Sequence, residues 1–161
     1  MAINKQEVSI LVVDDDKELA DGLVDYLSGL GYFVAAAYSG QEGLKKFENG
    51  AFQLVITDLK MPDMDGMALL EAVKTQDNQA VVIVITGYGT VESAVKAIKK
   101  GAYDFINKPV EMQSLEVVIN RALERHELSK QLSVFKGLTL ALIISVPLWL
   151  ILGILFALVW K

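Results

Sequence analysis

The chain has 161 residues, which is enough for one ordinary domain and a short additional segment. Its formal net charge is −5, and an acidic chain lacks the basic patches that bind phosphate backbones, so we expect no direct nucleic-acid partner. It contains no cysteine, which excludes disulfides and thiolate metal sites. Residues 1–7 are polar and lack the apolar core of a secretory signal, so we expect no export through such a signal.

Strand and helix patterns alternate from Val8 to about Arg125. Five apolar runs predict strands at Val8–Val13, Phe33–Ala36, Leu54–Thr57, Ala80–Ile85 and Asp104–Ile106. Helical patterns follow them at Lys17–Leu30, Ser39–Phe47, Asp65–Val73, Thr90–Lys100 and from Ser114 onward. The strands are almost continuously apolar, as in a parallel sheet covered by helices on both faces. We therefore predict an α/β fold with a doubly wound, five-stranded parallel sheet.

Polar residues stand at the carboxyl ends of four of these strands. Asp14 and Asp15 come directly after the first strand, Asp58 comes directly after the third, Thr86 follows the fourth and Lys108 follows the fifth. In open α/β sheets this edge is where ligands bind. Adjacent carboxylates need a cation, and oxygen ligands without His or Cys suit Mg²⁺. With an ammonium and a hydroxyl nearby, the set fits phosphoryl transfer, with Asp58 as a reasonable phosphoryl acceptor.

Four motifs in this order carry a family resemblance. They are Val12–Asp16, the run Thr57–Gly66, Ile85–Gly87 and Lys108–Pro109. From residue 8 to about 125 the chain resembles the receiver domains of two-component response regulators, most closely those of the nitrogen-regulator type. The resemblance implies a flavodoxin-like receiver with strand order 2-1-3-4-5.

The resemblance also implies a role for each matching residue. Asp58 would accept phosphate from a phosphohistidine on a sensor histidine kinase. Mg²⁺ would bind Asp15, Asp58 and the backbone carbonyl of Lys60, with Asp14 acting largely through metal-bound water. Lys108 would hold the phosphoryl oxygens and the Thr86 hydroxyl would swing towards them. Phe105 matches the switch aromatic but lacks the hydroxyl that many relatives carry, and family members often have a cis bond before the proline that matches Pro109.

Other acidic residues have simpler interpretations. Asp16 directly precedes a helix and is expected to be its N-cap, in preference to a metal ligand. Asp63 and Asp65 are expected to be turn and cap residues.

The carboxyl-terminal segment departs from the family pattern, which usually continues into an ATPase and a DNA-binding domain. Residues 137–160 contain no charged residue, and 24 helical residues would extend roughly 36 Å, enough to cross a hydrocarbon core of about 30 Å. We predict a receiver domain over residues 1–126, a helical stalk over 127–136 and a transmembrane helix over 137–160 that contacts lipid. A re-entrant hairpin turning at Pro147 is the alternative to a single span.

We therefore predict that the chain is a membrane-anchored receiver with its phosphorylation site in the cytoplasm. It would not be an enzyme acting on a separate substrate, but a phosphoacceptor that promotes its own phosphorylation and dephosphorylation. A homodimer through the last receiver helices or the membrane span is a further expectation. The alternatives are a phosphorelay intermediate or phosphate sink, an inactive binding scaffold, and a haloacid-dehalogenase-like phosphatase that would use Asp14 and Asp16 as its nucleophile pair.

Overall fold

The computed structural model describes residues 4–128. The chain divides into two compact units, Met1–His126 and Glu127–Lys161. No helix within the described range is long and apolar enough to cross a membrane. The predicted span at 137–160 and nearly all of the predicted stalk lie outside the described residues.

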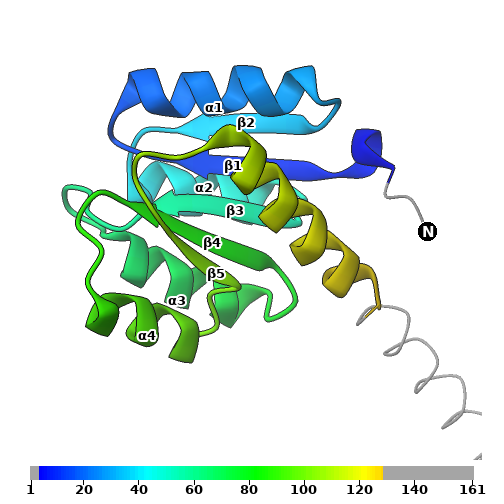
Figure 1. Cartoon of the computed structure of the whole chain (residues 1–161). Helices are drawn as coiled ribbons and strands as arrows, with labels where there is room; N and C mark the ends of the chain where they lie inside the picture. Colours follow the sequence, from blue (N-terminus) through cyan, green and yellow to red (C-terminus); the bar gives the residue numbers. More distant parts are fainter. Residues whose placement is uncertain (1–3, 129–161) are drawn as a thin grey trace, which may run out of the picture. The chain divides into compact units, whose positions relative to one another are not determined.

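The sheet has the predicted architecture. Five parallel strands, β1 (Ser9–Val13), β2 (Phe33–Ala37), β3 (Leu54–Asp58), β4 (Val81–Thr86) and β5 (Asp104–Asn107), lie in the order β2-β1-β3-β4-β5 (Figure 1). Four helices, α1 (Lys17–Gly29), α2 (Gly40–Asn49), α3 (Gly66–Gln76) and α4 (Val91–Lys99), follow the first four strands in turn. A short 3₁₀ helix, η1 (Lys5–Glu7), precedes β1, and residues 112–128 after β5 are helical.

The core has two layers, one on each face of the sheet. On one face Ile10 and Ile56 pack with Leu23 of α1 and with Ile119 of the 112–128 helix. On the other face alternate strand residues such as Val55 pack against α2, α3 and the small side chain of Ala97 in α4. Successive strand residues point to opposite faces, and both faces are covered, which is why the strands are apolar without interruption.

The predicted helix starts are confirmed by their capping contacts. Asp16 accepts hydrogen bonds from the backbone N–H groups of Glu18 and Leu19, and is therefore the N-cap of α1. The side chains of Ser39, Asp65 and Thr90 likewise cap the helices that follow them. These contacts fix where each helix begins after a strand, and so fix the loops that surround the carboxyl edge of the sheet.

The strand ends differ from the prediction in one informative way. β3 includes Asp58 and β4 includes Thr86, since Asp58 pairs with Ile85 and Thr86 pairs with Asn107 in the sheet register. The apolar pattern ends one residue earlier in each strand, whereas backbone pairing continues. The side chains of Asp58 and Thr86 are therefore carried by paired strand residues and not by loops.

Gly66 shows how closely α3 approaches the end of β3. Its backbone N–H donates to the carbonyl oxygen of Leu59 at 3.0 Å. A Cβ at this position would collide with the carbonyl oxygen of Asp58. Only glycine allows the first turn of α3 to lie against the backbone of Asp58, which helps to fix the direction of the Asp58 side chain.

Candidate functional site

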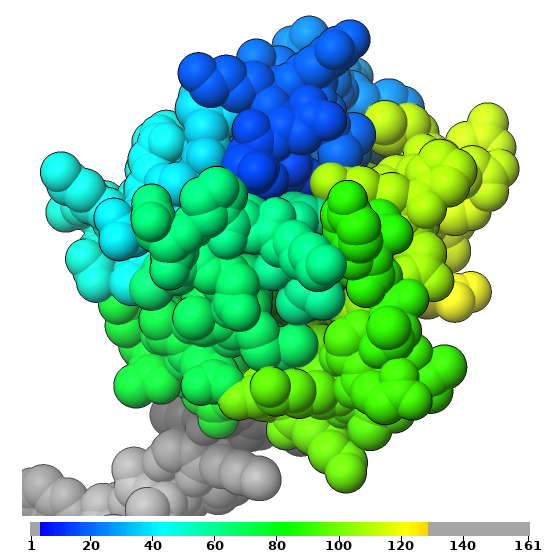
Figure 2. All heavy atoms as spheres, turned by 90° about the vertical axis from the view of Figure 1, so that its left-hand side faces the viewer, coloured from blue at the N-terminus to red at the C-terminus, as the bar shows by residue number. Residues whose placement is uncertain are grey.

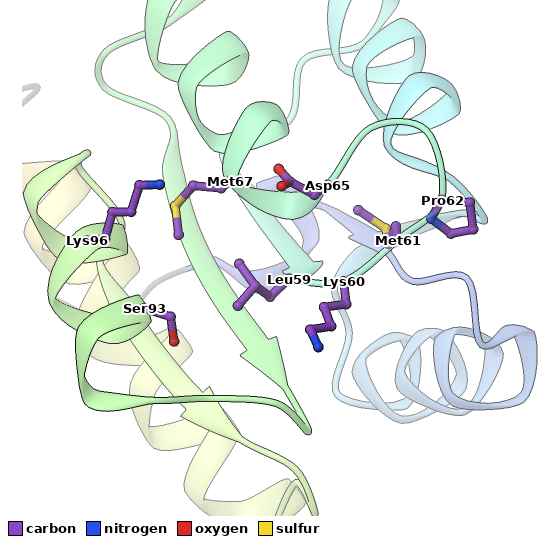
Figure 3. Close-up of a pocket in the computed structure, with 8 residues that line it drawn as sticks. All are labelled: Leu59, Lys60, Met61, Pro62, Asp65, Met67, Ser93 and Lys96. Carbon is purple, nitrogen blue, oxygen red and sulfur yellow. The ribbon is translucent and has the colours of Figure 1, made fainter.

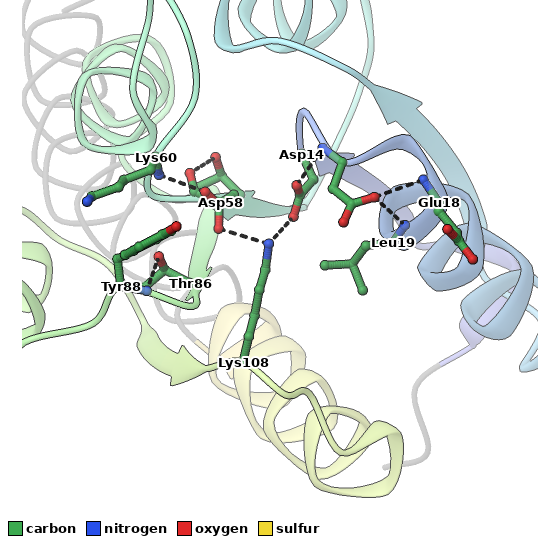
Figure 4. Close-up of polar contacts among 10 residues, drawn as sticks. Asp14, Glu18, Leu19, Asp58, Lys60, Thr86, Tyr88 and Lys108 are labelled. Atoms are coloured by element: carbon green, nitrogen blue, oxygen red, sulfur yellow. Dashed lines mark hydrogen bonds and ion pairs between the residues drawn. The ribbon is translucent and has the colours of Figure 1, made fainter.

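Segments from four strands come together at the carboxyl edge of the sheet. Figure 2 views this edge and shows the segment after β1 (blue) beside those after β3 (blue-green), β4 (green) and β5 (yellow-green). The close-up in Figure 4 places Asp14, Asp58, Thr86 and Lys108 around a common centre. The structure thus brings together four of the residues that the sequence pattern selected.

Asp58 is a buried carboxylate held from two sides. Only 5% of the residue is exposed. One oxygen, Oδ2, accepts a hydrogen bond of 2.7 Å from the backbone N–H of Lys60, and the other, Oδ1, lies 3.0 Å from the Lys108 ammonium (Figure 4). These contacts fix the plane of the carboxylate. An oriented carboxylate next to a cation is a suitable nucleophile for a phosphorus centre.

Lys108 joins the two buried carboxylates of the site. Its Nζ donates to Asp14 Oδ2 at 2.8 Å and lies 3.0 Å from Asp58 Oδ1. Burial on its own would lower the pKa of Lys108, but the hydrogen bonds and ion pairs with Asp14 and Asp58 outweigh it and raise that pKa. Lys108 is therefore an ammonium ion at neutral pH, in reach of any group attached to Asp58.

Asp14 is the second buried carboxylate of the site. It is 3% exposed, and its Oδ1 accepts a hydrogen bond from the backbone N–H of Asp16. Burial raises the pKa of the Asp14 carboxyl, although its hydrogen bonds with Lys108 and Asp16 act in the opposite direction. A carboxylate that is costly to bury gains from a second cation nearby, and this favours a site that accepts a metal ion.

The remaining predicted metal ligands are Asp15 and the backbone carbonyl of Lys60. Asp15 is exposed, and the carbonyl of Lys60 follows directly on the N–H that holds Asp58. No three acidic, His or Cys side chains within residues 4–128 are grouped so that they alone could hold a metal. The donors that do face one another are all oxygens, and Mg²⁺ typically uses one or two carboxylates and completes its shell with other oxygens. The donor set fits that ion, and its binding here stays a prediction.

Thr86 and Phe105 are the two residues predicted to form the switch, and that role stays a prediction. Thr86 is fully buried, and its Oγ1 accepts a hydrogen bond of 3.2 Å from the backbone N–H of Tyr88. Phe105 is half-buried and packs at the margin of the core layer that includes Val84. A Cβ on Gly89 would collide with the Asn107 side-chain oxygen and come within 2.8 Å of the Phe105 ring, so the loop after β4 passes close to both side chains. The predicted cis bond before Pro109 is confirmed.

A pocket of about 560 Å³ lies beside this site. It separates the loop after β3 from α4 and is lined by Leu59, Lys60, Met61, Pro62, Asp65, Met67, Ser93 and Lys96 (Figure 3). At its edge the Lys60 ammonium lies 4.0 Å from the centre of the Tyr88 ring. No sequence pattern predicts this contact, because Lys60 and Tyr88 come from different loops and neither is part of a hydrophobic pattern.

Comparison with known proteins identifies the family. The model of the response regulator receiver domain matches residues 10–120, which is more than half of the chain. The chain belongs to the response regulator receiver family. The transcriptional regulatory protein ZraR of Escherichia coli K12 is 40% identical over 116 residues, which are 72% of this chain and 26% of that protein. The chain thus spans about a quarter of the length of such curated relatives.

Solved receiver structures agree with this assignment. A receiver domain protein from Clostridium thermocellum is 36% identical with a TM-score of 0.72, over 75% of this chain and 98% of that chain. NtrX from Brucella abortus is 38% identical with a TM-score of 0.74, over 78% of this chain and 29% of that chain. The receiver domain of NtrC4, solved as a beryllofluoride-activated dimer, is 39% identical with a TM-score of 0.70, over 73% of this chain and 98% of that chain. The nitrogen-regulator resemblance is therefore confirmed for the receiver domain.

Proposed function

We propose that this receiver is a phosphorylation switch in which Asp58 accepts a phosphoryl group from a phosphohistidine of a sensor kinase. The observation that carries the proposal is the position of the Lys108 ammonium between Asp14 and the buried, oriented Asp58. In the transfer, an oxygen of Asp58 attacks phosphorus, the P–N bond to the imidazole breaks, and its electron pair returns to the imidazole nitrogen. The product is an acyl phosphate on Asp58.

The chain's own residues would supply orientation and charge in this step. The backbone N–H of Lys60 aims the Asp58 carboxylate, and Lys108 balances charge on the phosphoryl oxygens. Mg²⁺ held by Asp14, Asp15, Asp58 and the Lys60 carbonyl would supply further positive charge to those oxygens. The Thr86 hydroxyl would donate to a phosphoryl oxygen after leaving the Tyr88 N–H, and Phe105 would turn into the space that Thr86 vacates.

This proposal predicts Mg²⁺-dependent phosphorylation. The full chain in mild detergent, mixed with Mg²⁺ and a small phosphoryl donor such as acetyl phosphate, should gain one phosphoryl group that hydroxylamine removes. The phosphorylated peptide should contain Asp58. Chelation of Mg²⁺ should abolish incorporation, because the carboxylates then repel the incoming phosphate. Incorporation that is unaffected by chelation would contradict the proposed site.

We propose further that the receiver is anchored to a membrane by residues 137–160. The support is the sequence alone: 24 uncharged positions, of which fifteen are Leu, Ile, Val or Phe. At about −0.3 to −0.6 kcal/mol each, these residues favour insertion by roughly 5–9 kcal/mol. With the receiver on the side of the kinase and of ATP, Lys130 and Lys136 would flank the span on the cytoplasmic side.

Anchoring predicts a difference in membrane extraction. The full chain should stay with membranes after a carbonate wash, whereas residues 1–136, which include the whole compact unit Met1–His126, should be released. The matched control is the full chain with Ile144→Lys and Leu148→Lys, since each mid-membrane Lys costs about 2.5–3.5 kcal/mol. Release of the unaltered full chain by carbonate would count against the anchor, and retention of the double-Lys variant would point to a different attachment.

A further inference from the structure

Lys60 and Tyr88 each bind a site residue through the backbone, and they contact each other through their side chains. Each lies two residues beyond a site residue, and its backbone N–H donates to that residue's side chain: Lys60 to Asp58 at 2.7 Å and Tyr88 to Thr86 at 3.2 Å. Their side chains meet, with the Lys60 ammonium 4.0 Å from the centre of the Tyr88 ring. In Figure 4 the Tyr88 side chain extends towards Lys60, next to Thr86.

The segment that carries Tyr88 has few other side-chain anchors. Tyr88 is 68% exposed, and Ala97 is the only buried residue among the nine of α4. The pocket of Figure 3 leaves open space between α4 and the loop after β3. On its other side the segment passes close to the side chains of Asn107 and Phe105 at Gly89. The contact between Lys60 and Tyr88 therefore bridges the two loops at the mouth of the site, where packing is light.

A phosphoryl group on Asp58 would compete with the Tyr88 ring for the Lys60 ammonium. Such a group carries about −1.5 to −2 charges, and Lys60 is two residues away along the chain. An exposed cation–π contact is weak, worth roughly a two- to fivefold factor in an equilibrium constant. A nearby dianion in a partly buried site attracts an ammonium more strongly than a neutral ring does.

We propose that the Lys60–Tyr88 contact is a latch, which holds the Thr86-bearing segment in its resting position and opens when a phosphoryl group draws Lys60 from the ring. This inference rests on the proposed function of Asp58. When Lys60 leaves the ring, Tyr88 would be free to move together with its backbone N–H, which holds the Thr86 hydroxyl. Thr86 would then turn inward more readily. A contact that exists only in the resting state shifts the equilibrium between the resting and active states towards the resting state, by the factor that the contact itself is worth.

The latch predicts tighter binding of a phosphoryl analogue when the ring is removed. We would titrate beryllofluoride with Mg²⁺ into the full chain in mild detergent and follow the bound species by ¹⁹F NMR. Tyr88→Leu should lower the half-saturating concentration roughly two- to fivefold. Tyr88→Phe, which keeps the ring, should match the unaltered chain. Tyr88 is exposed, so neither substitution should impair folding.

The Lys60→Met background tests whether the effect passes through the ammonium. There the ring has no cation to hold, so Tyr88→Leu should no longer change the half-saturating concentration. A gain that persists in this background, or no gain with Lys60 present, would overturn the latch.

A direct readout is the ¹H shift of the Lys60 ε-methylene group. It should be moved upfield by the Tyr88 ring in the resting chain and return towards its usual value with beryllofluoride. An upfield shift that persists in the saturated complex would also overturn the latch. If the unaltered chain binds no beryllofluoride with Mg²⁺ present, the proposed function fails, and the latch fails with it. Normal binding with unchanged variants would refute the latch alone.

Discussion

Replacement of Asp58 by Asn should lower phosphoryl incorporation at least about 10³-fold, to the background given by other side chains. An amide has no anionic oxygen to form the acyl phosphate, although its shape is nearly that of the carboxylate. The Asn carbonyl oxygen can still accept the hydrogen bond from the Lys60 N–H, so the fold should persist. Phosphate incorporation from acetyl phosphate, quantified by mass spectrometry with far-UV circular dichroism as a folding check, measures the effect.

Asp63→Asn is the matched control for this substitution. Asp63 lies in the loop after β3, is exposed, and has a φ of 64°, a backbone conformation that Asn adopts as readily as Asp. The same chemical change five residues away should therefore leave incorporation within about twofold of the unaltered chain. Equal loss in both variants would mean that the acidity of the loop, and not Asp58, determines phosphorylation. Full incorporation in Asp58→Asn would place the acceptor elsewhere.

The fold was predictable because the signals that specify it are local. Apolar runs, turn residues and capping side chains such as Asp16 and Thr90 lie within a few residues of the structure that they specify. Parallel strands also end at one edge of the sheet, so the sequence pattern alone predicts a common site for Asp14, Asp58, Thr86 and Lys108. Family resemblance added the strand order, since spacing alone does not fix which strands are neighbours.

The parts that were missed depend on contacts between distant segments. The inclusion of Asp58 and Thr86 in β3 and β4 follows from register with Ile85 and Asn107, which the apolar pattern of one strand does not contain. The contact between Lys60 and Tyr88 joins two polar, exposed side chains from separate loops. The 112–128 helix begins two residues before the predicted Ser114. Helix ends are where sequence patterns are least informative, since the first turn makes few buried contacts.

Lys108→Met should slow phosphorylation of Asp58 by about 10²–10³-fold, the usual effect of removing one charge-stabilising donor from a transition state. It should at the same time tighten Mg²⁺ binding by roughly tenfold, because one unit of positive charge a few Å away opposes a cation by at least about 1.4 kcal/mol. Initial rates with acetyl phosphate at saturating Mg²⁺ measure the first effect, and a Mg²⁺ titration without donor measures the second.

The opposite directions of these two effects distinguish a role in transfer from a structural one. A variant that merely loosened the site would lose Mg²⁺ affinity and rate together, since both depend on the same carboxylates. Lys17→Met is the matched control: Lys17 is an exposed cation at the start of α1, near the same edge of the sheet, and it lies 5.3 Å from the Tyr38 ring instead of between two acids. Its loss should change neither quantity more than about twofold. In the resting site the Lys108 ammonium balances the negative charge of Asp14 and Asp58, and it therefore bridges these two carboxylates before any phosphoryl group arrives. Mg²⁺ would compete with Lys108 for the carboxylates, and a phosphoryl group would compete with them for Lys108.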